Sequence, residues 1–131
     1  MFWLLRDAVT LAIPDASARR AAELVRATAH AWARGAPSNA AADLVVDIDL
    51  SILGRDFLRF MDYEYGVEEE HSSVATVAFR CGRGRFLKAL LARPHIFRTA
   101  YFRDRYEQRA RTQIADLPAT KRYRKYRWLL R

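Results

Sequence analysis

Apolar residues recur along most of the chain at intervals of three and four positions, the spacing that places them on one face of an α-helix. The β-branched residues form only short clusters, and no long stretch alternates between apolar and polar residues. A proline or a glycine follows each periodic stretch. The pattern predicts an all-α fold, a compact bundle of five to six helices, over residues 2–12, 15–34, 38–53, 55–65, 73–92 and 99–116.

Two acids interrupt the strongly apolar segment DIDLSILG at residues 47–54. On a helical wheel, the apolar side chains around them cover an arc of about 240°. Asp47 falls in the polar gap and is expected to face solvent, whereas Asp49 falls within the apolar arc and is expected to be buried. A buried carboxylate needs a partner. Three kinds would serve, namely an arginine such as Arg83, backbone or hydroxyl donors, or a divalent metal ion.

Four segments carry a resemblance to a known family, and they read DIDLSILG at 47–54, EYGV at 64–67, FRCGRGRFL at 79–87 and LLARPHIFRT at 90–99. In this order they are similar to the predicted metal-dependent phosphohydrolases of the HD superfamily, over about residues 5–117. The resemblance implies an HD-domain-like fold in which a His, a His-Asp dyad and a later Asp hold a divalent metal that assists hydrolysis of a phosphate ester. The later Asp of that pattern corresponds to Asp49.

The resemblance covers only the C-terminal part of the family pattern. The first His and the His-Asp dyad precede the matched stretch, and the sequence contains no His-Asp dipeptide. His30 stands where the family often carries a histidine, so Asp49 and His30 are the metal-ligand candidates, with an exposed helix histidine as the plainer interpretation of His30. Two ligands are too few for tight binding of Mn, Fe, Ni, Zn or Mg. We therefore expect a truncated or degenerate HD-like protein without catalysis of its own, and predict no catalytic residue.

The GRGR segment at residues 82–85 offers a candidate for substrate binding. It lacks the lysine and the hydroxyl residue of a P-loop, so one interpretation is a helix with glycine at a close helix contact. An arginine beside the presumed site would stabilise the charge of a phosphate ester. Arg83 is therefore the substrate-binding candidate, for a phosphate-containing small molecule such as a nucleotide.

The net charge of +8 is concentrated at the C-terminus. Residues 118–131 carry +6 and no acid, so we expect a domain over residues 1–117 followed by a basic aromatic tail. The alternative function is a binding module in which this tail holds nucleic acid or a protein partner. Contact with an anionic membrane, or docking of the tail onto the domain, are further alternatives. The nucleic-acid-binding candidates are Lys121, Arg122, Arg124, Lys125 and Arg127.

The hydropathy and the cysteine count of the chain bear on its cellular compartment, and its apolar surface bears on its assembly. No apolar stretch reaches the roughly 18–20 residues that a transmembrane helix needs. The single cysteine, Cys81, cannot form an internal disulfide, which favours a cytoplasmic protein. A domain without its first helices would expose apolar surface, so a homodimer is one candidate assembly.

Overall fold

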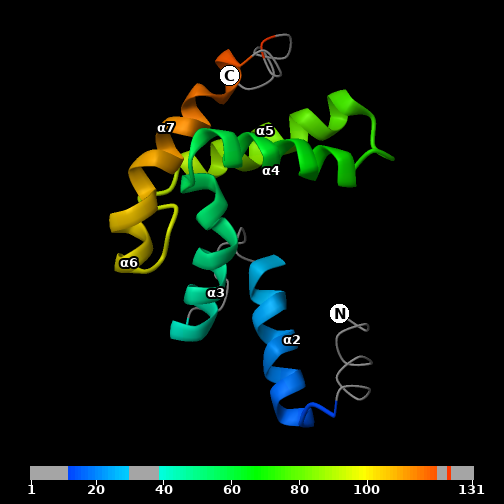
Figure 1. Ribbon diagram of the computed structural model, residues 1–131, viewed down its shortest axis with the longest axis vertical. Helices are drawn as coiled ribbons and strands as arrows, with labels where there is room; N and C mark the ends of the chain where they lie inside the picture. The colour runs from blue at the N-terminus through cyan, green and yellow to red at the C-terminus, as the bar shows by residue number, and fades with distance from the viewer. Residues whose placement is uncertain (1–11, 30–38, 121–123, 125–131) are drawn as a thin grey trace. The chain divides into compact units, whose positions relative to one another are not determined.

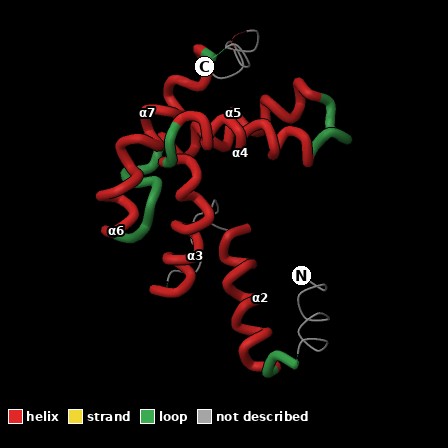
Figure 2. The backbone as a smooth tube through the Cα atoms, in the orientation of Figure 1, coloured by secondary structure: helices red, strands yellow, loops and turns green. Residues whose placement is uncertain are grey.

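The computed structural model describes residues 12–29, 39–120 and 124, and every regular element within these residues is helical (Figures 1 and 2). The all-α prediction is confirmed for this part of the chain, whereas the helix predicted over residues 2–12 lies outside it. The chain divides into two compact units, residues 1–49 and 50–131, and each is described by itself.

The first unit contains helices α2 (Asp15–Ala29) and α3 (Ala40–Leu50). Helix α2 buries the small side chains of Ala18 and Ala22, which lie one turn apart on the same face. Helix α3 begins after Asn39, whose side-chain Oδ1 accepts the amide N–H of Ala42 at 2.9 Å. Asn39 thus satisfies one of the unpaired amides of the first helical turn.

Helix α3 reverses the exposure that the helical wheel predicted for its two acids. Asp47 is fully buried, next to Val46 on the buried face, whereas Asp49 is exposed. Leu44 and Ile48, at the edge of the apolar arc, are about half exposed. Because the apolar arc is much wider than the stripe that a helix normally buries, the pattern left open which part of the arc turns inward. The prediction of a solvated Asp47 and a buried Asp49 was wrong.

The second unit begins with the 3₁₀ turn η1 (Ser51–Gly54), which is followed by helices α4 (Phe57–Glu70) and α5 (Thr76–Leu91). The next elements form one continuous helix, made of α6 (Ala100–Phe102), the π-helical turn η2 (Arg103–Glu107) and α7 (Gln108–Asp116). The short 3₁₀ turn η3 (Leu117–Ala119) follows. The buried apolar side chains of this unit include Leu53, Phe60, Leu87, Leu90, Ile96, Phe97, Phe102, Ala110, Ile114 and Leu117.

Helix α4 continues past the glycine at which the sequence predicted its end. Gly66 lies inside the helix, and a side chain at this position would meet no atom within 4 Å. A glycine inside a helix costs only about 1 kcal/mol, which neighbouring contacts can offset, so it is a weak stop signal. The helix ends instead at Glu70, before the turn of His71.

Helices α4 and α5 lie side by side as a helical hairpin (Figure 1), and two ion pairs join them. Arg80 of α5 donates from Nε to Glu68 of α4 at 3.0 Å. One turn further along, Arg83 of α5 contacts Glu64 of α4. The two acids are four residues apart and the two arginines three apart, so each pair lies on one face of its helix.

Candidate functional site

Asp49, the predicted metal-ligand position, is the penultimate residue of α3 and is exposed to solvent. The next residue, Leu50, is buried, and η1 follows directly. An exposed carboxylate has no desolvation penalty to offset. The argument from burial for a metal or an arginine at Asp49 therefore no longer applies, and the metal-ligand role that the resemblance implies stays a prediction.

The end of the DIDLSILG segment is held firmly against the long helix of the same unit. The Nε2 amide of Gln113 in α7 donates to the carbonyl oxygens of Leu53, at 2.8 Å, and Arg55, at 3.0 Å. A Cβ atom at Gly54 would lie 2.6 Å from Cβ and 2.7 Å from the carbonyl oxygen of Tyr106 in η2. Only glycine permits this approach of two backbones, which explains the residue that ends the segment.

Arg83, the predicted substrate-binding residue, is engaged in a buried ion pair. Its Nη2 lies 2.5 Å from Oε1 of Glu64, and its Nε lies 3.2 Å from each carboxylate oxygen. The Glu64 side chain is fully buried and that of Arg83 is 11% exposed. The guanidinium also lies over the rings of Tyr63 and Phe86, at 5.6 and 4.9 Å from their centroids. A phosphate at Arg83 would have to compete with the Glu64 carboxylate.

Arg83 thus holds the Glu64 carboxylate of the neighbouring helix. The burial from which the Arg83–Asp49 pair was predicted is not found, since Asp49 is exposed, and the pair itself stays a prediction. The role of Arg83 in binding a phosphate-containing ligand stays a prediction.

Three side chains of the long helix hold the loop at residues 92–99. Arg111 donates to the carbonyl oxygens of Leu91 at 3.0 Å, Arg93 at 2.7 Å and Pro94 at 3.0 Å. Glu107 accepts the backbone amides of Ile96 and Phe97, and Arg103 donates to the carbonyl oxygens of Phe97 and Arg98. Residues 103, 107 and 111 thus form a clamp on the loop backbone, at successive spacings of four residues.

Glu107 and Arg111 of this clamp also pair with each other, at 2.7 Å, and their i,i+4 spacing on the helix favours this contact. Burial by itself would raise the pKa of the Glu107 carboxyl. The backbone amides of Ile96 and Phe97 together with the Arg111 guanidinium outweigh burial and hold that pKa below its ordinary value of 4.5. In the loop, burial and then the nearby charge of Arg98 lower the pKa of Arg93.

The remaining candidates lie on the surface or outside the described residues. His30 and the tail residues Lys121, Arg122, Lys125 and Arg127 fall outside them, so their roles stay predictions. Arg124 is described and exposed, and its amide donates to the carbonyl oxygen of Thr120 at 2.9 Å. Within the described ranges, no three His, Cys, Asp or Glu side chains gather in a way that could hold a metal ion.

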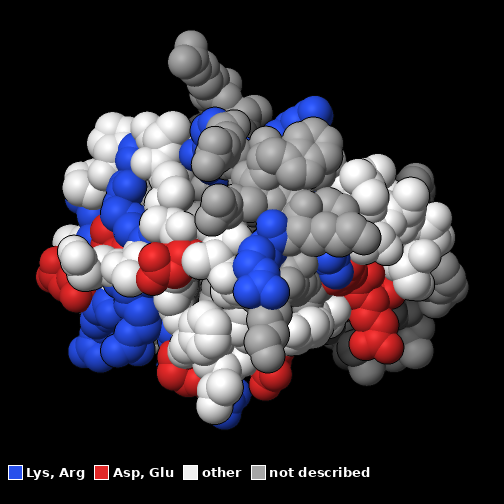
Figure 3. Space-filling model, turned by 90° about the horizontal axis from the view of Figure 1, so that it is seen from above, with Lys and Arg blue, Asp and Glu red and all other residues white. Residues whose placement is uncertain are grey.

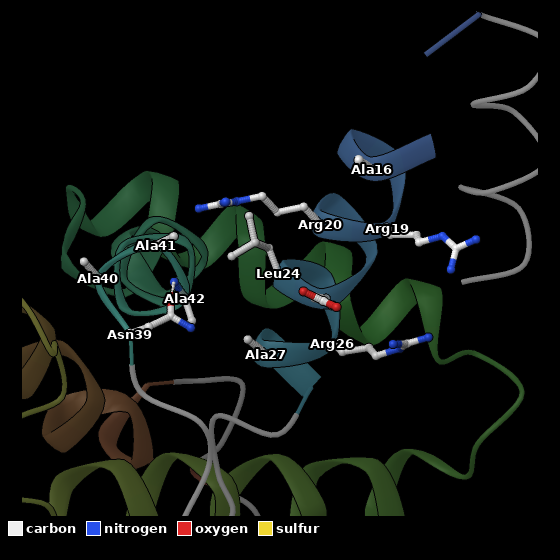
Figure 4. Close-up of a pocket in the computed structure, with 11 residues that line it drawn as sticks. Ala16, Arg19, Arg20, Leu24, Arg26, Ala27, Asn39, Ala40, Ala41 and Ala42 are labelled. Atoms are coloured by element: carbon white, nitrogen blue, oxygen red, sulfur yellow. Dashed lines mark hydrogen bonds between the residues drawn. The ribbon is translucent and has the colours of Figure 1, made fainter. Parts of the chain in front are cut away.

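A cleft of about 1010 Å³ lies in the first unit, between α2 and the start of α3 (Figure 4). Small and apolar side chains such as Leu24, Ala27 and Ala42 line it. Arg19 and Arg20 also line it, and Figure 4 shows the Arg20 side chain extending toward Ala41 and the Arg19 side chain extending in the opposite direction. Arg19 is paired with Asp15 of its own helix at 2.8 Å. The described lining contains none of the residues predicted to bind a metal or a substrate.

Acidic and basic side chains lie interspersed on the face of the molecule displayed in Figure 3. Among the described residues, no helix is both long enough and apolar enough to span a membrane.

Comparison of the chain with protein-family models, with curated proteins and with solved structures gave no match.

Sequence reasoning missed Glu64 and Gln113, the two described polar side chains that make long-range contacts from buried positions in the second unit. Glu64 opens the EYGV segment of the resemblance, yet its role is to pair with Arg83, nineteen residues further along. Helical spacing was the one signal in the sequence that could have indicated the burial of Glu64. Glu64 lies four residues after Phe60, so the two side chains fall on the same apolar face of the helix.

Proposed function

We propose that this chain is a degenerate relative of the HD-superfamily phosphohydrolases that serves as a helical scaffold and has no catalysis of its own. The observation that carries the proposal is the exposed position of Asp49 at the end of α3, in a described structure where no other donors gather into a metal site. One carboxylate does not fit the ligand set of a catalytic divalent metal, which takes three or more protein ligands at a defined geometry. No hydrolytic step is therefore derived.

The surroundings of Asp49 support a structural role for this segment. The residues directly after it are fixed by the Gln113 hydrogen bonds and by the Gly54–Tyr106 contact. Such contacts anchor a helix end whether or not a metal is present. The segment that resembles a metal-binding element thus joins α3 to the rest of the chain.

Metal content of the purified full-length protein tests the proposal. We would load wild type, Asp49→Ala and Asp62→Ala with Mn, Fe, Ni, Zn or Mg, remove loosely bound ions, and measure the metal by elemental analysis. Asp62 is the matched control, because it is an exposed helical carboxylate of α4. We expect substoichiometric metal in all three proteins and no phosphomonoesterase activity above the buffer. Stoichiometric metal that only Asp49→Ala loses would contradict the proposal.

A further inference from the structure

The outer half of the hairpin formed by α4 and α5 has no core of its own. From Tyr65 to Arg83, a stretch that the structure describes throughout, no residue is fully buried. The buried residues of the two helices lie nearer the other end, where the hairpin contacts η1 and α7, and they are Phe60, Glu64, Gly84, Leu87 and Leu90. Helices in proteins gain most of their stability by packing an apolar face. The outer half would therefore gain stability from a further partner.

Large apolar side chains lie exposed on both helices of the hairpin. On α4, Leu58 and Tyr65 are two turns apart and are exposed by 73% and 57%, and Phe57 beside them is exposed by 51%. On α5, Val77 is 48% exposed, and the half-buried Cys81 follows one turn later. We call these five residues the hairpin face. Exposed apolar groups that cluster in this way commonly mark an interaction surface.

The exposed residues of the two helices turn to the same side of the hairpin. On a helical wheel, Tyr65 lies about 60° from Glu68, on the side away from the buried ion pair of the hairpin. Val77 lies about 60° from Arg80, also on the side away from that pair. Because Glu68 and Arg80 contact each other, the two stripes border the same side of the helix pair. The hairpin face is thus one continuous surface built by two helices.

Charge indicates what this surface fits. Helix α4 carries five acids and one arginine, whereas α5 carries three arginines, one lysine and no acid. A surface that joins an acidic helix to a basic helix is complementary to a copy of itself. If α4 of one copy covers α5 of the other, unlike charges meet in both contacts. Placing α4 on α4 would bring like charges together instead.

We propose that two copies of this chain associate through the hairpin face. Each α4 lies antiparallel across the α5 of the other copy, and the two hairpins form a four-helix bundle about a two-fold axis. The apolar side chains of the face become the buried seam of the bundle. The inference is independent of the proposed function, because it involves neither Asp49 nor a metal.

The register of the hairpin predicts one ion pair between the copies. Asp62 lies two residues before Glu64, and Arg85 lies two residues after Arg83, so the antiparallel helices place them at the same level. Two residues are about 200° around a helix, so both exposed side chains point away from the neighbouring helix of their own chain. In the dimer, Asp62 of one copy and Arg85 of the other flank the apolar seam together.

Sedimentation velocity of the full-length protein tests the association. The 14 residues of α4 span about 21 Å, so the contact is smaller than a standard protein interface and we expect a dissociation constant of about 10 µM. At about 100 µM the protein should have twice the chain mass of 15.2 kDa, and it should dissociate on dilution. A monomer at that concentration would overturn the proposal. A species larger than a dimer would also overturn it, because a two-fold contact closes at two copies.

Exchange of charge tests the register. Asp62→Arg and Arg85→Asp should each weaken the dimer about tenfold, because each creates two like-charge contacts across the two-fold axis. The double variant restores both pairs, and its dissociation constant should return to within about threefold of wild type. Asp104→Arg is the matched control, since Asp104 is an exposed acid of η2, and it should leave the dimer unchanged. A double variant as weak as the single ones would contradict this arrangement.

A substitution on the apolar seam tests the face itself. Leu58→Ser should weaken the dimer at least tenfold, because it removes apolar contact at two symmetric positions. Leu44→Ser is the matched control, a half-exposed leucine of α3, and it should leave the dimer unchanged. Circular dichroism checks that both variants keep their helices. A dissociation constant of Leu58→Ser equal to that of wild type would contradict association through the hairpin face.

Discussion

Two regions of the second unit are held together by charged and polar side chains that bind different kinds of partner. One is the hairpin of α4 and α5, and the other, which we call the junction, is where α7 and η2 meet η1 and the loop at residues 92–99. In the hairpin, Glu64 and Glu68 pair with Arg83 and Arg80, so side chains of one helix hold side chains of the other. In the junction, Gln113 and the clamp residues Arg103, Glu107 and Arg111 contact the backbone of η1 and of the loop at residues 92–99.

This difference determines what a substitution leaves behind. A lost partner in the hairpin leaves a buried charge without its counterion, which is among the costliest defects in a protein. A lost partner in the junction leaves backbone amides or carbonyls without a hydrogen bond, a smaller penalty per group. The hairpin should therefore be more sensitive to single substitutions of charge, and the junction more sensitive to changes of shape.

The largest effect is expected for Arg83→Met. This change removes the guanidinium from the fully buried Glu64 carboxylate and should lower the free energy of unfolding by about 3–5 kcal/mol. Urea denaturation followed by circular dichroism measures it. Arg80→Met is the control in the same hairpin, where Glu68 is 21% exposed, and it should cost about 1 kcal/mol. An equal loss of unfolding free energy in the two variants would show that the deeper burial of the Arg83–Glu64 pair does not increase its contribution to stability.

The next effect concerns the shape of the junction. In Gly54→Ala, the new methyl group would lie within 3 Å of the Tyr106 backbone, which cannot move without shifting η2, so we expect a loss of about 2–3 kcal/mol. Gly82→Ala is the matched control, because its added methyl group meets nothing within 4 Å inside α5, and alanine should stabilise that helix by up to about 1 kcal/mol. Thermal denaturation of both variants checks the opposite signs.

The smallest effect is expected for Glu107→Gln, and it should depend on pH. The glutamine keeps the shape but loses the charge that the two loop amides and Arg111 stabilise, so we expect a loss of about 1–2 kcal/mol at pH 7. Because the folded-state pKa of Glu107 lies below its ordinary value of 4.5, the carboxylate contributes this stability above pH 4.5. Its contribution falls as pH drops through the folded-state pKa.

Urea denaturation of wild type and Glu107→Gln between pH 7 and pH 3 measures this dependence. The two curves of free energy against pH should converge at the acid end. A constant difference across the range would show that the clamp depends on the shape of the side chain rather than on its charge.

Helical spacing was sufficient to locate most of the described helices. The predicted regions 15–34, 38–53, 73–92 and 99–116 contain α2, α3, α5 and the continuous helix from α6 to α7. The predicted end at Gly66 failed because a glycine inside a helix weakens that helix by only about 1 kcal/mol. The π-helical turn η2 has no signal in the spacing, and it lies where Tyr106 meets Gly54.

The sequence by itself determined that the described chain is helical, because periodicity and capping are local properties of the amino acids. Only the tertiary structure decided which acids are buried. Asp47 and Asp49 belong to the same short, apolar helix, and a wheel with apolar residues over most of its circumference has no unique inward face. Burial of Asp47 and Glu64, and exposure of Asp49, follow from long-range packing, which one segment of sequence does not contain.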